Sequence, residues 1–272
     1  MSGCGLRPYV SAKGLEQLRE RLSGRDLAII GQIGDLRMMS ARQIEAVHFP
    51  ASEHDSQPAA ARARQRVLGR LVRDRLLIRL ERRIGGVRAG SAGFVFAVGP
   101  VGYRLLAADG QARRFQEPTS RFLDHTLATA QLVVDVGVAS RGGLLDILVC
   151  QAEPRCHREF SGLGGRRVLR PDAFFALGVG AFEWRWFCEI DRGSESVPVI
   201  LRKCHLYADY YQSGQEQAKH RGVFPTVCWI VPDARRAERL RQAIDHDRHL
   251  PDRLFVVTTS ERALTVLTGG RT

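Results

Sequence analysis

Lysine is scarce in this sequence. Only three of its 41 basic residues are lysines, and the rest of the positive charge is carried by arginine. Such a bias is typical of a GC-rich genome, so a single arginine carries little information by itself. The three lysines are Lys13, Lys203 and Lys219.

Long apolar runs and paired cysteines are also missing. No run approaches the roughly 18 apolar residues of a membrane span, and the first residues lack the apolar core of a signal peptide. We therefore expect a cytoplasmic protein without a membrane partner. The six cysteines form no CxxC pair, which favours reduced, buried thiols over a zinc site. They are Cys4, Cys150, Cys156, Cys188, Cys204 and Cys228.

Two nucleotide-related motifs are absent as well. The sequence has no GxxxxGK[ST] loop, and Gly178-Val179-Gly180 is too short to cradle a phosphate chain. It also offers no aromatic-rich strand motif of the kind that stacks splayed RNA bases. An RNA-binding factor is therefore a weaker interpretation than a DNA-binding one.

Charge is present in excess and unevenly spread. Residues 1–116 hold 20 Lys+Arg against 10 Asp+Glu, a net charge of +10, whereas residues 117–272 hold 21 against 19, a net charge of +2. A basic module joined to a near-neutral one indicates a polyanion-binding domain attached to a second domain.

The basic half has the pattern of three helices followed by two strands. Ser23 and Ser40 are good N-caps for the first two helices. A third helix is predicted over 59–77, and a strand, a basic Gly-rich turn and a returning strand follow before residue 100. This order resembles a winged helix-turn-helix, in which the third helix enters the major groove and the hairpin tip contacts the phosphate backbone.

Arginines mark both expected contact elements. Arginine suits either role, because its planar fork binds guanine edges or phosphate oxygens in two places. The alternative interpretation is that these arginines form a solvated helix face of an arginine-rich protein and do not contact DNA. The predicted contacts with double-stranded DNA are Arg62, Arg64, Arg66, Arg70 and Arg73 on the third helix, and Arg82, Arg83 and Arg88 at the wing.

The second half predicts an α/β sandwich around a mixed sheet, with elements in the order α-β-β-β-α-β-α-β. Residues 153–167, rich in Gly and Arg, are expected to form a loop, and 170–193 a hairpin. The fold class is therefore α+β or α/β, with a winged-helix domain over 1–110, a linker over 111–118 and a sandwich domain over 119–272.

Three carboxylates mark the hairpin. Alternation along 182–191 places Glu189 and Asp191 on one face, toward which Asp172 on the neighbouring strand would also point. Carboxylates so placed suit Mg²⁺ or Mn²⁺, which prefer oxygen ligands. Asp172, Glu189 and Asp191 are the candidate metal ligands.

The hairpin resembles the PD-(D/E)xK nuclease signature, through Pro171-Asp172 and Glu189-x-Asp191. The resemblance implies metal roles for Asp172 and Glu189, but Asp191 occupies the position of the signature lysine. Lys203, on the following helix and one turn from Tyr207, can replace that lysine, because the superfamily tolerates migrated lysines. The catalytic candidates are Asp172, Glu189, Asp191 and Lys203.

The whole chain resembles the replication-relaxation family of plasmids and integrative elements. The segments FLDHTLA, RPDAFF and EIDRG carry this resemblance, over roughly residues 20–245. It implies a role in plasmid replication, DNA relaxation or transfer. The partners expected with it are double-stranded DNA, replication or conjugation proteins of the same element, and a second copy of the chain.

Two hypotheses remain open. The second domain either nicks DNA with Mg²⁺ or Mn²⁺, or it is an inactive platform for dimerisation or partner binding in a transcriptional regulator that needs no cofactor. His125 has two interpretations too, because a histidine at that position either faces the carboxylates or bonds to solvent or a neighbouring carbonyl.

Overall fold

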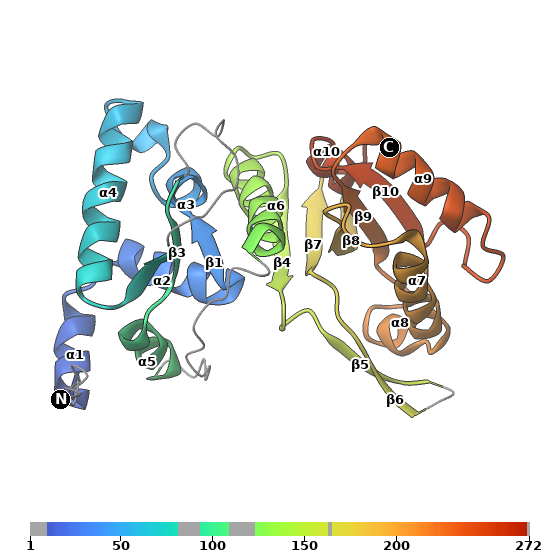
Figure 1. Cartoon of the computed structure of the whole chain (residues 1–272), viewed down its shortest axis with the longest axis horizontal. Coiled ribbons are helices and arrows are strands. Elements are labelled where there is room, and N and C mark those ends of the chain that lie inside the picture. The colour runs from blue at the N-terminus through green and yellow to red at the C-terminus, as the bar shows by residue number, and fades with distance from the viewer. Residues whose placement is uncertain (1–9, 81–92, 109–122, 163–164, 271–272) are drawn as a thin grey trace, which may run out of the picture. The chain divides into compact units, whose positions relative to one another are not determined.

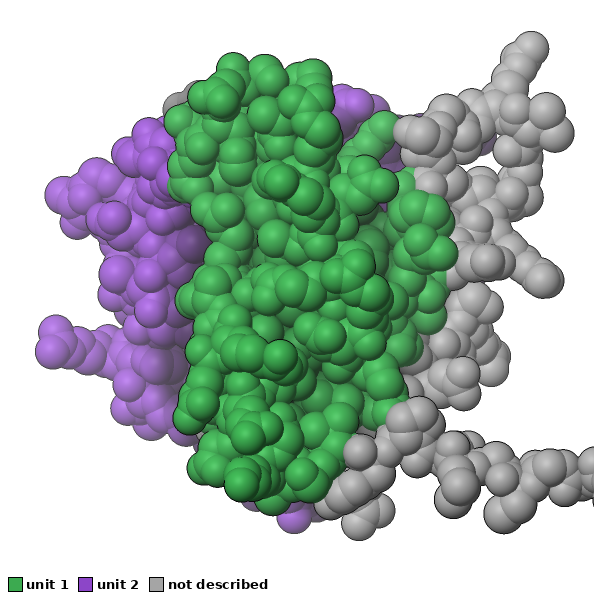
Figure 2. Space-filling model, turned by 90° about the vertical axis from the view of Figure 1, so that its left-hand side faces the viewer, with its two compact units in different colours: residues 1–123 green, residues 124–272 purple. Residues whose placement is uncertain are grey.

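The computed structural model of the chain describes residues 10–80, 93–108, 123–162 and 165–270. These residues form two compact units, residues 1–123 and 124–272, which Figure 2 shows in separate colours. The predicted linker, 111–118, lies outside the described residues. Within the described part, no helix has both the length and the apolar composition to cross a bilayer.

Unit 1 packs helices on a three-stranded antiparallel sheet of order β1-β3-β2. Its core is formed by apolar side chains from α2, α3, α4 and β3, and every residue of β3 is buried. The elements are α1 (Ala12–Glu20), α2 (Gly24–Leu36), β1 (Met38–Ser40), α3 (Ala41–His48), the 3-10 turn η1 (Ala51–Glu53), α4 (Gln57–Arg73), β2 (Leu77–Leu80), β3 (Val95–Val98) and α5 (Pro100–Ala108).

The two predicted helix caps are confirmed. Ser23 accepts a hydrogen bond from the backbone N–H of Asp26 at 3.2 Å, and the Asp26 carboxylate accepts one from the backbone N–H of Ser23 at 2.8 Å. Ser40 and Gln43 make the same reciprocal pair at the start of α3. Each pair satisfies backbone donors that a helix start leaves without intrahelical partners.

The third helix is shorter than predicted. It ends at Arg73 because Arg75 has a left-handed backbone with φ 58°, which no α-helix continues through. The chain then enters β2, so that Leu76 and Leu77 join the core instead of a helix face. Gly102 fits against this turn, since an added Cβ would lie 2.2 Å from the carbonyl oxygen of Leu76.

Unit 2 has a five-stranded mixed sheet of order β10-β9-β8-β7-β4, with helices on both faces (Figure 1). β8, β9 and β10 run parallel to one another, β7 is antiparallel to β8, and β4 is antiparallel to β7. The elements are α6 (Leu123–Arg141), β4 (Asp146–Ala152), β5 (Arg158–Gly162), β6 (Gly165–Leu169), β7 (Ala173–Val179), β8 (Phe182–Ile190), α7 (Val197–Gln212), α8 (Gln215–Lys219), β9 (Thr226–Val231), α9 (Ala234–Asp245), β10 (Phe255–Thr259) and α10 (Ala263–Leu267).

The two faces of this sheet bury separate apolar clusters. α7 and α9 cover one face, where Phe187, Tyr207 and Trp229 are buried together. α6 and α10 cover the other face, where Trp186 and Cys188 are buried. Alternate residues of β8 therefore belong to opposite clusters, as the sequence pattern predicts.

The prediction of a loop over 153–167 is wrong. This segment contributes β5 and β6, which pair as an antiparallel ribbon beside α7 (Figure 1). Only Phe160 and Leu169 of the ribbon enter the apolar cluster of the α7 face. The apolar residues of the two strands, Phe160, Val168 and Leu169, do not alternate with polar ones, so the sequence does not reveal these strands.

Candidate active site

Asp172 and Glu189 lie on neighbouring strands of the unit 2 sheet. The antiparallel pairing of β7 and β8 ends at Ala173 and Cys188; Asp172 immediately precedes Ala173, and Glu189 immediately follows Cys188. The backbone N–H of Ile190 donates to Oδ2 of Asp172 at 2.7 Å, which fixes that carboxylate against β8. The structure thus brings together two of the three predicted carboxylates.

Glu189 is buried beneath α7. Its side chain is 1% exposed and contacts the ammonium of Lys203, while the hydroxyl of Tyr207 donates to its Oε1 at 2.6 Å. Lys203 and Tyr207 reach the same carboxylate because residues four apart share one face of a helix. Burial raises the pKa of Glu189 to about 8, assisted by the charge of Asp172 and opposed by Lys203 and Tyr207.

Asp172 is paired with His125 of α6. The two atoms His125 Nε2 and Asp172 Oδ1 lie 3.1 Å apart. This hydrogen bond raises the pKa of His125 against the opposing effect of burial. Burial would raise the pKa of Asp172, but the bond with His125 and the charge of Lys203 outweigh it and lower that pKa below its usual value.

Asp191 has a different partner. Its carboxylate accepts a hydrogen bond from Nε of Arg236 at 2.6 Å and another from the backbone N–H of Gly193 at 2.8 Å. Arg236 belongs to α9 and also donates to the backbone carbonyl of Glu195. Asp191 therefore ties the end of β8 to α9. Among the described residues, no three His, Cys, Asp or Glu side chains form a group that could hold a metal ion.

The resulting centre combines complementary groups. Asp172 supplies a carboxylate with a lowered pKa, Glu189 one with a raised pKa, and Lys203 an ammonium whose pKa the two carboxylates raise against the effect of burial. The side chains of Lys203 and His125 are 30% and 37% exposed, so the centre is open to solvent on their side. Such a set can bind a cation, stabilise an anion and transfer a proton.

Residues 30–227 match the model of the replication-relaxation family, which is more than half of the chain. The chain belongs to the replication-relaxation family. No curated protein and no solved structure matches it. The matched segment includes both carboxylates of the centre, Lys203 and the arginine-bearing helix α4.

The predicted DNA-contacting arginines of this family member fall into three groups. Arg62, Arg66 and Arg73 are exposed on α4. Arg64 forms an ion pair with Glu45, and Nη2 of Arg70 lies 2.6 Å from Oδ1 of Asp26, whose side chain is 2% exposed. The remaining three, Arg82, Arg83 and Arg88, lie outside the described residues.

Sequence reasoning missed Arg236. It follows Asp191 by 45 residues, on a helix that also carries Arg235, Arg239 and Arg241, and no local pattern sets it apart. The only available signal was its place near the start of a helix that follows a buried strand. His125, for which two interpretations were open, proves to face the carboxylates.

Proposed function

We propose that the chain is a DNA-binding protein of a mobile genetic element that acts in DNA replication or relaxation. Unit 1 binds double-stranded DNA as a winged helix, and unit 2 is a PD-(D/E)xK-like domain that nicks DNA with Mg²⁺ or Mn²⁺. The observation that carries this proposal is the convergence of Asp172, Glu189 and Lys203 at the ends of β7 and β8.

The element order of unit 1 supports the winged-helix assignment. α2, β1, α3, α4, β2 and β3 follow one another along the chain, and β1 completes the sheet that β2 and β3 form. In this arrangement α4 is the third helix, which enters the major groove in winged-helix proteins. Its exposed arginines, Arg62, Arg66 and Arg73, would contact the DNA.

The donor set of unit 2 fits a hard divalent cation. Mg²⁺ is commonly held by one or two carboxylates and completes its shell with water and substrate phosphate oxygens. Asp172 and Glu189 are two such carboxylates and lie beside Lys203, whereas Asp191 meets Arg236 of α9 and the backbone N–H of Gly193. We therefore assign metal binding to Asp172 and Glu189 and a structural role to Asp191.

The chain's own groups have distinct tasks in this proposal. When bound, the cation would polarise the phosphodiester and lower the pKa of a water molecule. Lys203 would stabilise the negative charge that develops on the phosphate oxygens. His125, whose pKa is raised by Asp172, would donate a proton to the leaving oxygen or contact a phosphate.

A specific observation also favours the second candidate function. Both carboxylates already have internal partners, since Glu189 contacts Lys203 and Tyr207, and Asp172 contacts His125. A centre whose carboxylates are all paired with groups of the same domain can be retained as a binding surface without catalytic activity. The chain would then be a winged-helix regulator whose inactive nuclease-like domain serves dimerisation or partner binding.

Supercoiled plasmid carrying the native element distinguishes the two functions. The protein is incubated with it in Mg²⁺, Mn²⁺ or EDTA, alongside Glu189→Gln and the matched control Glu183→Gln, which alters an exposed carboxylate of the same strand. Nicking that requires metal and Glu189 but not Glu183 supports the nickase. Plasmid that is shifted but uncut, equally in EDTA and in both variants, supports the regulator.

A further inference from the structure

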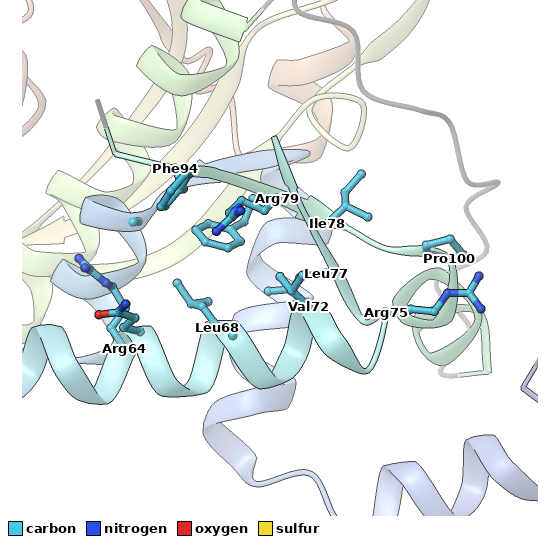
Figure 3. A pocket seen from close by; sticks show the side chains of 13 residues that line it. Arg64, Leu68, Val72, Arg75, Leu77, Ile78, Arg79, Phe94 and Pro100 are labelled. Carbon is cyan, nitrogen blue, oxygen red and sulfur yellow. The ribbon is translucent and has the colours of Figure 1, made fainter. Parts of the chain in front are cut away.

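Unit 1 contains a pocket between α4 and the paired strands β2 and β3 (Figure 3). Its volume is about 910 Å³. Leu68 and Val72 line it from α4, and Ile78 and Phe96 from the strands. Pockets that hold small-molecule ligands occupy about 300–1,000 Å³, so this one has room for a planar ring system. Its apolar lining suits the faces of such a ring.

Among the described residues that line the pocket, the polar side chains are uncharged or positive. Arg64, Arg75 and Arg79 belong to this set, and Arg64 also forms an ion pair with Glu45. A ligand with negative charge is therefore favoured over a cationic or neutral one.

An aromatic side chain stands at the rim of the pocket. Phe94 is 48% exposed, and the guanidinium carbon of Arg79 lies 4.2 Å from its ring centroid. Exposed aromatic rings and arginine planes are the surfaces on which proteins stack unpaired nucleobases.

The pocket adjoins the exposed arginines of α4. Gln65 and Gly69 line the pocket, and helical geometry places them beside the stripe formed by Arg62, Arg66 and Arg73. A DNA strand whose phosphates contact this stripe can direct one base into the pocket. The amide of Gln65 can both donate to and accept from the edge of that base.

Gly69 lines the pocket from α4. A glycine in a helix interior lowers helix stability relative to alanine. An added Cβ at Gly69 would meet no atom within 4 Å, so packing does not require glycine here. The missing side chain keeps the α4 wall of the pocket open.

We propose that this pocket binds an unpaired nucleobase of the DNA that unit 1 contacts. The proposal rests on DNA binding by unit 1 and adds a structural preference to it. The protein should then bind a duplex with one extrahelical nucleotide more tightly than the fully paired duplex of the same sequence.

Fluorescence anisotropy with the full chain measures this preference. The two duplexes are compared for the native protein, Phe94→Ala and Gly69→Met. Gly31→Met is the matched control, because Gly31 is also a helix-interior glycine with no atom within 4 Å of an added Cβ and does not line the pocket. Thermal unfolding verifies that each variant is folded.

We expect the native protein and Gly31→Met to prefer the extrahelical nucleotide by about tenfold, in the range of one stacked base. Phe94→Ala and Gly69→Met should lose this preference while their affinity for the paired duplex stays within about twofold. A 2-aminopurine at the extrahelical position should be quenched by the native protein and not by these two variants.

Two results overturn the proposal. One is equal affinity of the native protein for both duplexes, and the other is a preference that survives in Phe94→Ala and Gly69→Met. If either result occurs while the protein still binds the paired duplex with an affinity that depends on Arg66, only the pocket proposal fails. If neither duplex binds, DNA binding by unit 1 fails with it.

Discussion

The α4 helix of unit 1 and the β7–β8 centre of unit 2 use charge in different ways. On α4, Arg62, Arg66 and Arg73 are exposed and available to a polyanion. In the β7–β8 centre, Glu189 is buried and in contact with Lys203 and Tyr207. Exposed charges are screened and interact weakly one by one, whereas a buried charge strongly perturbs its neighbours.

The same contrast between exposed and buried ion-paired charges occurs among the arginines of a single helix. Arg70 lies on α4 among exposed arginines, yet it pairs with the buried carboxylate of Asp26. Arg236 lies on α9 among exposed arginines, yet it pairs with buried Asp191. An arginine's role is thus decided by the burial of the carboxylate it meets and not by its place in a basic run.

The largest expected effect is on stability, at the Asp191–Arg236 pair. Arg236→Ala leaves a carboxylate with no exposed side-chain surface and only the Gly193 backbone as a donor. We expect the free energy of unfolding to fall by about 3–5 kcal/mol, measured by urea denaturation. Arg239→Ala, an exposed position of the same helix, is the control, and an equal loss in both variants would contradict the structural role of Arg236.

The next effect is on catalysis, at Lys203. Lys203→Met removes the cation that would stabilise developing negative charge, so the nicking rate should fall about 100-fold or more. Lys203→Arg should retain part of the rate, and Arg202→Met, a neighbouring exposed position, should retain all of it. Full activity in Lys203→Met would remove this residue from the proposed site.

Arg66 and Arg70 test the contrast on one helix. Arg70→Ala leaves buried Asp26 with only Ser23 as a donor, and should lower the free energy of unfolding by about 1–3 kcal/mol. Arg66→Ala should leave stability unchanged and reduce the slope of log affinity against log salt by about 0.9 for one lost phosphate contact. If Arg66→Ala lowers stability and leaves the salt slope unchanged, the exposed stripe is not a DNA contact.

The smallest expected effect is the pH dependence of the His125–Asp172 pair. The pKa of His125 is raised above its ordinary value of 6.5, so protonated His125 stabilises the fold fully below that pH. This contribution is lost as the pH rises through the raised pKa. The difference in melting temperature between the native protein and His125→Gln should therefore shrink from pH 6 to pH 9.

A double variant tests this origin of the pH effect. In an Asp172→Asn background, the partner that raises the pKa of His125 has lost its charge. Adding His125→Gln to that background should change the melting temperature far less than in the native protein. An equal change in both backgrounds would assign the pH dependence to another group.

The sequence by itself determined the local features of this protein. Ser23 and Ser40 cap their helices because the hydroxyl oxygen of each accepts a hydrogen bond from the backbone N–H three residues later. This bond joins residues that are close in the sequence, so it does not depend on the tertiary structure. Strand alternation placed Glu189 on the α7 side of β8, since the period of a strand is fixed by its backbone. Helical spacing placed Lys203 and Tyr207 on one face, where both reach Glu189.

Only the tertiary structure decided the partners of the remaining charges. Asp191 follows the strand alternation, yet it binds Arg236, which lies 45 residues away, and His125 meets Asp172 across 47 residues. The β5–β6 ribbon forms without a clear alternating pattern, and Phe160 and Leu169 of this ribbon pack into the apolar cluster on the α7 face of the sheet. Which charged residues pair depends on which buried groups the packed helices bring within hydrogen-bond distance of one another. The local periodicity of the sequence does not predict these long-range distances.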